Sequence, residues 1–292
     1  MPDSLCQMTD GEFAGLSRLI HVKTGIYLPS HKRALLMARL SGRLRLHGFR
    51  SFRDYLSYLT EEDCDGRELI EMINCVTTNQ TEFFREGHHF DFLAETVFPG
   101  CLRRVRDGGE PKIRIWSAGC STGEEPYSIA MTMMEYFGGL SGWDVQILAS
   151  DLDTLVLETA GLGIYPPGRI GATPEDLRKK YLLPIPVGNR TVFRVDDRIR
   201  NLVTFRRINL LESPWPIREV FDVIFCRNVM IYFTQETITE IVTKFVRFLR
   251  PGGFLLIGHA ETLFHVTDRL RPIRATVYQR IDGSPPLGPA TK

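Results

Sequence analysis

The sequence has no long hydrophobic run and no excess of charge of one sign. No apolar stretch of its 292 residues reaches the roughly 18 residues that span a bilayer. The amino terminus also lacks the basic-then-apolar pattern of a secretory signal. The formal net charge of +1 argues against general attraction to nucleic acid. We therefore expect a cytoplasmic, monomeric protein without membrane insertion or a nucleic-acid partner.

Cysteine patterns that bind metals are absent as well. The six cysteines include no C-x-x-C pair, so neither a zinc site nor a dithiol redox motif is indicated, and we expect no metal. The chain does contain 43% hydrophobic and 24% charged residues. This composition is typical of a globular protein of one or two domains.

Two different periodicities divide the chain. Residues 1–75 carry apolar residues at helical spacing and predict a small all-helical N-terminal domain. Residues 76–111 are expected to form linker helices. Residues 112–282 alternate short apolar runs with amphipathic segments, which predicts a doubly wound, Rossmann-like α/β domain built on a parallel sheet. Residues 283–292 are rich in Pro and Gly and predict a disordered tail.

The elements expected in the α/β domain are short. A break in its rhythm at residues 182–200, which contain prolines and a Gly-Asn turn, predicts an inserted β-hairpin. The predicted helices are Glu124–Phe137, Thr154–Ala160 and Gln235–Leu249. The predicted strands are Lys112–Trp116, Val145–Ser150, Leu202–Phe205, Phe221–Cys226 and Gly253–Gly258, with Ala275–Ile281 as an edge strand.

The segment 113–126 reads as a strand, a turn of small residues and the start of a helix. In an open α/β sheet such a turn lies where ligands bind, and Gly119 and Gly123 let the backbone approach a ligand closely. The acidic pair Glu124-Glu125 would repel a pyrophosphate at this helix end but suits the cationic S-adenosylmethionine. The same glutamates could instead stabilise the positive end of the helix dipole.

Two aspartates follow the next predicted strand. Asp151 stands at its end, where a carboxylate can accept hydrogen bonds from ribose hydroxyls. Asp153 is more simply explained as a helix cap.

Residues 119–123 also satisfy G-x-S-x-G, the nucleophile motif of α/β-hydrolases, and Asp222 and His259 follow in the order of that triad. However, Asp222 precedes its apolar run instead of following it. The chain before Gly119 also looks helical, whereas a hydrolase has several strands there. We therefore disfavour the hydrolase interpretation.

Four strings together resemble the CheR family of chemotaxis receptor methyltransferases. They are the loop at 113–126, TTNQTEFFRE at 77–86, ASDLD at 149–153 and FDVIFCRNVMIYF at 221–233, and the similarity extends over about residues 10 to 280. The resemblance implies transfer of a methyl group from S-adenosylmethionine to glutamate side chains on the cytoplasmic domain of a chemotaxis receptor. The products would be glutamate methyl esters and S-adenosylhomocysteine.

The resemblance also implies roles for individual residues. Cofactor binding would fall to Asn79, Thr81 and Arg85 as a cover, Glu124 at the methionine moiety, Asp151 at the ribose, Asn209 and Leu210 at the adenine, and Arg227 and Asn228 near the methyl group. Tyr232 is our candidate to orient the incoming carboxylate, with Arg85 second. Alternatively, Tyr232 packs beneath the pocket, and Arg85 is a surface residue of a helix beginning near Thr81.

Basic residues are concentrated between His21 and Arg53, where eight Lys or Arg occur without any Asp or Glu. On a helix from about Lys32, one basic face opposes a leucine stripe and would attract acidic receptor helices. We expect Arg39 and Arg43 to bind substrate there, although a solvated face is the simpler alternative; Lys32 and Arg50 complete that face. The predicted hairpin lacks the Gly-rich loop of relatives that dock on a receptor tail, which argues against tethering.

Two other classes of function stay open. A nucleic-acid methyltransferase would share the fold, but residues 226–229 read Cys-Arg-Asn-Val instead of the Asn/Asp-Pro-Pro-aromatic loop of amino-group methylation, and the chain has no Pro-Cys nucleophile. A regulator would bind the cofactor without releasing a methylated product.

Overall fold

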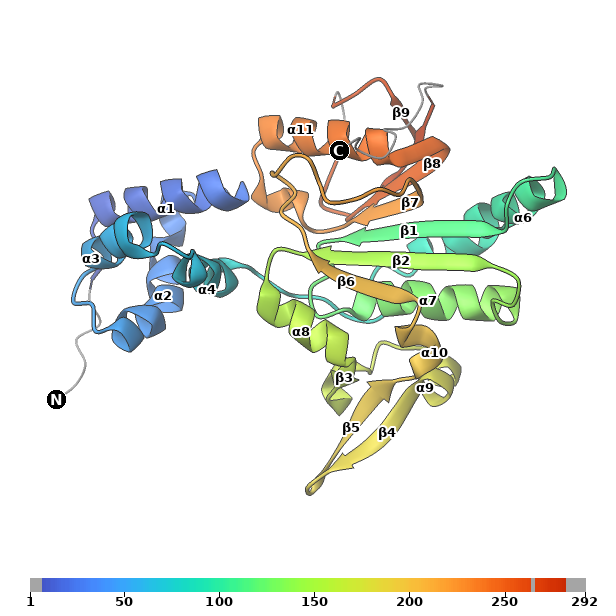
Figure 1. Ribbon diagram of the computed structural model, residues 1–292, viewed down its shortest axis with the longest axis horizontal. Helices are drawn as coiled ribbons and strands as arrows, with labels where there is room; N and C mark the ends of the chain where they lie inside the picture. The colour runs from blue at the N-terminus through green and yellow to red at the C-terminus, as the bar shows by residue number, and fades with distance from the viewer. Residues whose placement is uncertain (1–6, 264–265, 282–292) are drawn as a thin grey trace.

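The computed structural model describes residues 7–263 and 266–281 and consists of a helical domain beside an α/β domain (Figure 1). The predicted tail at 283–292 lies outside the described residues. Within the described ranges, no helix combines the length and the apolar character that crossing a membrane requires.

The helical domain packs its leucine and aromatic side chains into a core of its own. Leu16, Leu40, Phe52 and Met72 are fully buried in it. The apolar positions recur at helical spacing, so each helix turns one face inward. Its helices are α1 (Asp10–Thr24), α2 (Arg33–His47), α3 (Phe52–Ser57) and α4 (Arg67–Val76), with a 3-10 turn η1 (Ser30–Lys32) and a π turn η2 (Tyr58–Glu62).

The segment that joins the two domains is only partly helical. Residues 77–87 contain turns and no helix, so the alternative that placed Arg85 on a helix beginning near Thr81 is wrong. The chain becomes helical at His88 and continues along the sheet as α5 (His88–Phe92), the π turn η3 (Leu93–Val97) and α6 (Phe98–Arg106).

A seven-stranded sheet with the order β6-β2-β1-β7-β8-β10-β9 forms the centre of the α/β domain. Its first five members pair in parallel, and β10 pairs antiparallel with both β8 and β9. The predicted fold class is therefore confirmed. The strands are β1 (Lys112–Ala118), β2 (Asp144–Asp151), β6 (Val203–Arg207), β7 (Phe221–Cys226), β8 (Leu249–Ile257), β9 (Leu270–Arg274) and β10 (Val277–Arg280).

Helices cover both faces of this sheet, so its central strands are apolar on both sides. On one face Ile113, Ile115 and Phe225 pack with α7 (Glu124–Phe137). On the other face Trp116 and Ile224 pack with α11 (Gln235–Phe248). The helix α8 (Thr154–Leu162) lies beside β2 and β6 and also contacts α4 of the helical domain.

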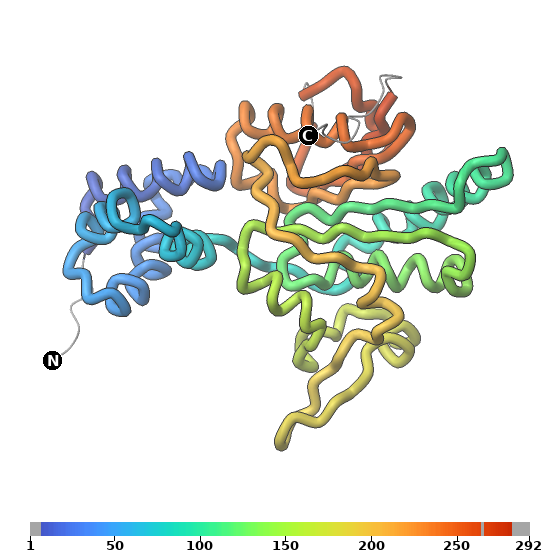
Figure 2. Tube along the Cα trace, in the orientation of Figure 1, coloured from blue at the N-terminus to red at the C-terminus, as the bar shows by residue number. Residues whose placement is uncertain are grey.

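The predicted insertion forms a small second sheet that projects from the body of the molecule (Figure 2). Its strand order is β3-β5-β4, so the hairpin of β4 (Leu182–Val187) and β5 (Arg190–Val195) gains β3 (Ile164–Tyr165) as a third strand. Gly188, with a φ of 57°, forms the turn. The 3-10 turn η4 (Pro167–Arg169) and the helices α9 (Glu175–Tyr181) and α10 (Asp197–Arg200) connect this sheet to the body.

Candidate active site

The turn after β1 is held open by two glycines and fixed by a strand neighbour. Gly119 has a φ of 83°, and a Cβ there would lie 2.3 Å from Cγ2 of Val229, so this position requires glycine. The Gly123 N–H donates to the Cys120 carbonyl oxygen within the turn, and the Gly119 N–H donates to the Ser150 carbonyl oxygen of β2. The turn thus brings bare backbone to the carboxyl edge of the sheet, where ligands bind in such folds.

Asp151, at the end of β2, connects this turn to the following helix. Its Oδ2 accepts the Ser121 N–H at 2.8 Å and its Oδ1 accepts the Asp153 N–H at 3.0 Å. Burial raises the pKa of Asp151, and the backbone hydrogen bonds oppose that shift. Asp153 accepts from Leu155 and Val156 as the N-cap of α8, so its explanation as a cap is confirmed.

The linker lies across the same edge. Asn79 donates from Nδ2 to Oδ2 of Asp153 at 2.6 Å, and its carbonyl oxygen accepts the Ser121 hydroxyl at 3.2 Å. Thr77 adds a 2.6 Å hydrogen bond to Asp153. These bonds hold residues 77–79 against the ends of β1 and β2.

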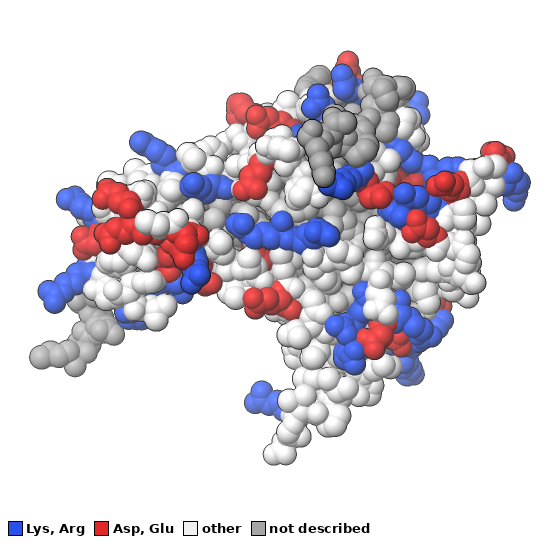
Figure 3. Space-filling model, in the orientation of Figure 1, with Lys and Arg blue, Asp and Glu red and all other residues white. Residues whose placement is uncertain are grey.

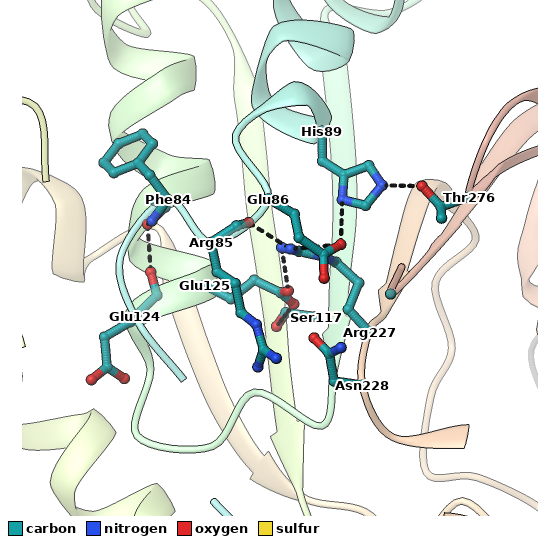
Figure 4. A network of polar contacts seen from close by, with 12 residues as sticks. Phe84, Arg85, Glu86, His89, Ser117, Glu124, Glu125, Arg227, Asn228 and Thr276 are labelled. Atoms are coloured by element: carbon teal, nitrogen blue, oxygen red, sulfur yellow. Dashed lines mark hydrogen bonds and ion pairs between the residues drawn. The ribbon is translucent and has the colours of Figure 1, made fainter. Parts of the chain in front are cut away.

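Arg227, directly after β7, is the central cation of a buried polar network (Figure 4). Its Nη1 lies 3.1 Å from Oε2 of Glu125 and its Nη2 lies 3.2 Å from Oε2 of Glu86. The guanidinium also donates to the carbonyl oxygen of Arg85. Burial raises the pKa of Glu125, while Arg227 and the Ser117 hydroxyl oppose that shift.

A carboxylate that sequence reasoning missed shapes the loop after Arg227. Glu261 accepts the Asn228 N–H at 2.9 Å and the Met230 N–H at 2.7 Å. Asn228 has a φ of 60°, an uncommon conformation that these bonds stabilise. Glu261 also accepts the Gly258 N–H at 2.5 Å, but its two partners in the loop lie about thirty residues earlier, so no local pattern indicates that it shapes this loop.

The helical domain closes the site from the other side. The Tyr27 N–H donates to the carbonyl oxygen of Tyr232 at 2.8 Å, and Asn209 donates from Nδ2 to the carbonyl oxygen of Lys23 at 2.8 Å. Within residues 7–263 and 266–281, the Tyr232 phenol makes no hydrogen bond. That hydroxyl therefore stays available to a ligand.

These elements enclose a cavity of about 450 Å³, within the range of small-molecule sites. Its walls come from the helical domain, the linker and the carboxyl edge of the sheet. The predicted residues that line it are Asn79, Thr81, Arg85, Asp151, Asn209, Leu210, Arg227, Asn228, Tyr232 and Arg39.

Glu124, which was expected at the methionine moiety, lies away from the cavity in the structure. The Glu124 side chain is fully buried and accepts from Nε of Arg169 at 2.9 Å and from the Thr122 hydroxyl at 2.7 Å. It does not line the cavity, whereas Glu125 does. The acidic group at this helix end that faces the cavity is therefore Glu125, since the first helical turn directs adjacent side chains differently.

The structure does not have the free basic face that was expected on a helix from about Lys32. α2 spans Arg33–His47, so Lys32 and Arg50 lie outside it. Arg43 pairs with Glu68 and lies 3.7 Å from Glu71. The face in Figure 3 has both signs of charge over the helical domain.

Arg39 is also held internally, but at the cavity wall. Its guanidinium donates to the carbonyl oxygens of Val76 and Thr77 and to the Thr78 hydroxyl. Substrate binding by Arg39 stays a prediction. Substrate binding by Arg43 also stays a prediction, but its guanidinium is already bound to Glu68.

The hydrolase triad is not assembled. Asp222 lies at the opposite end of β7 and accepts from Arg104 and Arg250, at 2.8 Å and 2.7 Å. The Ser121 hydroxyl donates to Asn79. Asp222 is therefore not placed to complete a triad with Ser121 as the nucleophile.

A parallel sheet of this order, with a ligand cavity at its carboxyl edge and the carboxylates of Asp151 and Glu125 in the wall, defines a Rossmann-like S-adenosylmethionine-dependent methyltransferase. Residues 79–279 match the family described as CheR methyltransferase, SAM binding domain, and residues 11–77 match CheR methyltransferase, all-alpha domain. The chain belongs to the CheR family of methyltransferases, and its cofactor is S-adenosylmethionine.

Curated relatives share nearly the whole length of the chain. It is 43% identical over 270 residues to "Chemotaxis protein methyltransferase 2" of Pseudomonas aeruginosa, covering 92% of this chain and 93% of the relative. It is 42% identical over 273 residues to "Chemotaxis protein methyltransferase" of Escherichia coli, covering 93% and 91%. The protein of the same name from Borreliella burgdorferi is 40% identical over 257 residues, covering 88% and 89%.

Proposed function

We propose that the protein transfers the methyl group of S-adenosylmethionine to glutamate side chains on the cytoplasmic domain of a chemotaxis receptor, forming methyl esters during adaptation. The observation that carries this proposal is the cavity between the helical domain and the sheet edge, which combines carboxylates with the available phenol of Tyr232. The names of the relatives, which refer to chemotaxis, support the choice of substrate.

The cavity suits this cofactor chemically. Glu125 and Asp151 provide negative charge that favours a sulfonium and an ammonium group. The positive charge of Arg227 is offset by two carboxylates at 3.1 Å and 3.2 Å, so it does not oppose a cationic ligand by itself. Asn79, Thr81 and Arg85 would cover the bound cofactor, with Asn209 and Leu210 at the adenine and Asn228 beside Arg227.

The chemistry asks little acid or base work of the protein. Bound S-adenosylmethionine supplies an activated methyl group with a neutral thioether as the leaving group. A substrate glutamate has a reference pKa of about 4.3 and is already ionised at neutral pH. The chain therefore acts by aligning the carboxylate, excluding water and providing a suitable electrostatic environment.

Tyr232 is our candidate to align that carboxylate. Tyr232 lines the cavity, and its backbone is fixed by the 2.8 Å hydrogen bond from Tyr27. Arg85 is the second candidate, since among the described residues its guanidinium donates only to the Gln80 carbonyl oxygen, from Nη1 at 2.9 Å. Either side chain can donate to a carboxylate without serving as a base.

Arg39 is the better placed of the two proposed substrate-binding arginines. It lines the cavity, and its partners are neutral carbonyl and hydroxyl oxygens, so no carboxylate offsets its positive charge. We expect Arg39→Glu to slow methylation of receptor while S-adenosylhomocysteine binding is retained. Equal methylation rates at low salt would count against this role.

The decisive experiment uses methyl-labelled S-adenosylmethionine and receptor-containing membranes, followed by mild alkali. Volatile label released as methanol identifies a methyl ester. Alkali-stable label would point to nitrogen or base methylation, and cofactor binding without any label would point to a regulator. Heat-inactivated protein and membranes that lack receptor are the controls.

A further inference from the structure

Three histidines and a glutamate meet beside Arg227, outside the cavity. Glu86, His88 and His89 each direct one ligand atom into the same space, and these atoms all lie within 4.8 Å of one another. His259, from the loop after β8, adds a fourth group, with its Nε2 3.5 Å from Nδ1 of His88 and 3.7 Å from Oε2 of Glu86. Methyl transfer as described above uses none of the three histidines, and uses Glu86 only as an ion-pair partner of Arg227.

The surroundings of His89 determine which ring nitrogen carries its proton. The Thr276 hydroxyl donates to the carbonyl oxygen of Ala275, so Oγ1 of Thr276 accepts the Nε2–H of His89 across 2.8 Å. We assign the tautomer from this network. It leaves Nδ1 of His89 with an unshared electron pair directed at Glu86 (Figure 4).

That arrangement leaves two buried acceptors facing each other. His89 is 0% exposed, and its Nδ1 lies 3.7 Å from Oε2 of Glu86. Within the described part of the chain, Nδ1 of His89 has no hydrogen-bond partner, and Oε2 of Glu86 has no hydrogen bond besides its 3.2 Å ion pair with Arg227. A buried polar atom without a partner is unfavourable, and two facing lone pairs repel. A cation between them would satisfy both.

We propose that Glu86, His88 and His89 form a binding site for a divalent transition-metal ion of the zinc type, with His259 as an additional ligand. Zinc binds imidazole nitrogen and carboxylate oxygen at about 2.0–2.2 Å. Two such ligands at a tetrahedral angle lie roughly 3.4 Å apart, close to the 3.7 Å between His89 and Glu86. Two histidines and a carboxylate are an established ligand set for such metals.

The backbone supports the same inference. Glu86 has a φ of 55° and Thr276 a φ of 65°, a conformation that costs non-glycine residues energy and occurs often at functional sites. With Glu86 bound to a metal ion, Arg227 still has Glu125 as an ion-pair partner at 3.1 Å, so Arg227 does not prevent metal binding. The expectation that the chain binds no metal rested on the spacing of its cysteines, which does not bear on adjacent histidines.

The test titrates zinc into the full chain, purified without a histidine tag and stripped with a chelator, using calorimetry and competition with a chromophoric chelator. We expect one zinc ion per chain. His88→Ala should weaken binding at least tenfold, because His88 is exposed and its loss removes a ligand without opening the core. His31→Ala is the matched control, since His31 is an exposed histidine of the helical domain, and it should bind zinc as the wild type does.

Thermal unfolding of the metal-free variants shows whether each is folded, and His88→Gln replaces His88→Ala if the latter is not. Absence of zinc binding to the wild type would overturn the proposal. Equal affinity of the wild type and the His88 variant would also overturn it, because the ion would then be held elsewhere. A cobalt-substituted protein offers an independent check: its visible absorption should be lost in the His88 variant and kept in the His31 variant.

Discussion

Replacing Arg43 by methionine should destabilise the helical domain and leave the cofactor site intact. Glu68 is buried, with a side chain only 4% exposed, and it accepts from Nε of Arg43 at 2.8 Å, from the Tyr55 hydroxyl at 2.7 Å and from His47 at 2.7 Å. Loss of one partner from a buried pair costs about 3–5 kcal/mol. Because Tyr55 and His47 remain, we expect about 3 kcal/mol.

Urea-induced unfolding of the wild type and the variant measures this difference. Arg45→Met is the matched control, because Arg45 is exposed on the same helix and such surface changes stay within about 0.5 kcal/mol. Adding Glu68→Gln to Arg43→Met should restore part of the loss, since it removes the uncompensated charge. A cost below about 1 kcal/mol would refute the view that Arg43 is chiefly structural, and would return it to the substrate-binding candidates.

The same pair predicts how stability depends on pH. The bonds from Arg43, Tyr55 and His47 outweigh burial and lower the pKa of Glu68 in the folded protein. This contribution is therefore complete above the unfolded value of about 4.3 and is lost as the pH falls through the folded pKa. The stability gap between wild type and Arg43→Met should narrow below about pH 4, whereas a constant gap would contradict the assignment.

Three further substitutions test the cavity. Tyr232→Phe should lower turnover at least tenfold with little change in S-adenosylhomocysteine affinity, measured by calorimetry, and unchanged turnover would remove this phenol from the mechanism. Asp151→Asn should weaken S-adenosylhomocysteine binding at least tenfold, whereas Asp144→Asn, at the exposed start of the same strand, should not. Gly119→Ala should abolish cofactor binding, because its Cβ would lie 2.3 Å from the Val229 side chain, and normal binding by this variant would refute the close approach. Its control is Gly42→Ala, which has open space around it and should raise stability by up to about 1 kcal/mol.

The elements with the strongest local signals were predictable from sequence. Phe221–Cys226 and Glu124–Phe137 have the bounds that their apolar patterns indicate. The start of β8 was not predictable, because the strand begins at Leu249 and continues through Pro251 and the two glycines, with a register shift against β7. Residues that look like a break between helix and strand instead form an irregularity inside the strand.

The position of the last strand was predicted incorrectly for a related reason. Residues 275–281 were expected to form an edge strand, but β10 lies between β8 and β9. The edge is β9, whose residues after Leu270 are exposed and include Pro272, a residue tolerated only at an edge. Its weak alternation conceals it, since an edge strand buries little.

The side chains of the site were recognised by type, but their partners could not be. Non-glycine residues with positive φ gather around the cavity and the histidine cluster: Phe84, Glu86, Ser121, Asn228 and Thr276. Such strain costs about 1–3 kcal/mol per residue, so five of them together would rival the net stability of a domain. Distant groups hold them in place, since Ser128 accepts the Phe84 N–H at 3.0 Å, Asp151 that of Ser121 at 2.8 Å and Glu261 that of Asn228 at 2.9 Å. The strained conformations exist only once the sheet has brought these groups together, which is why the local sequence predicts which residues belong to the site but not their orientation.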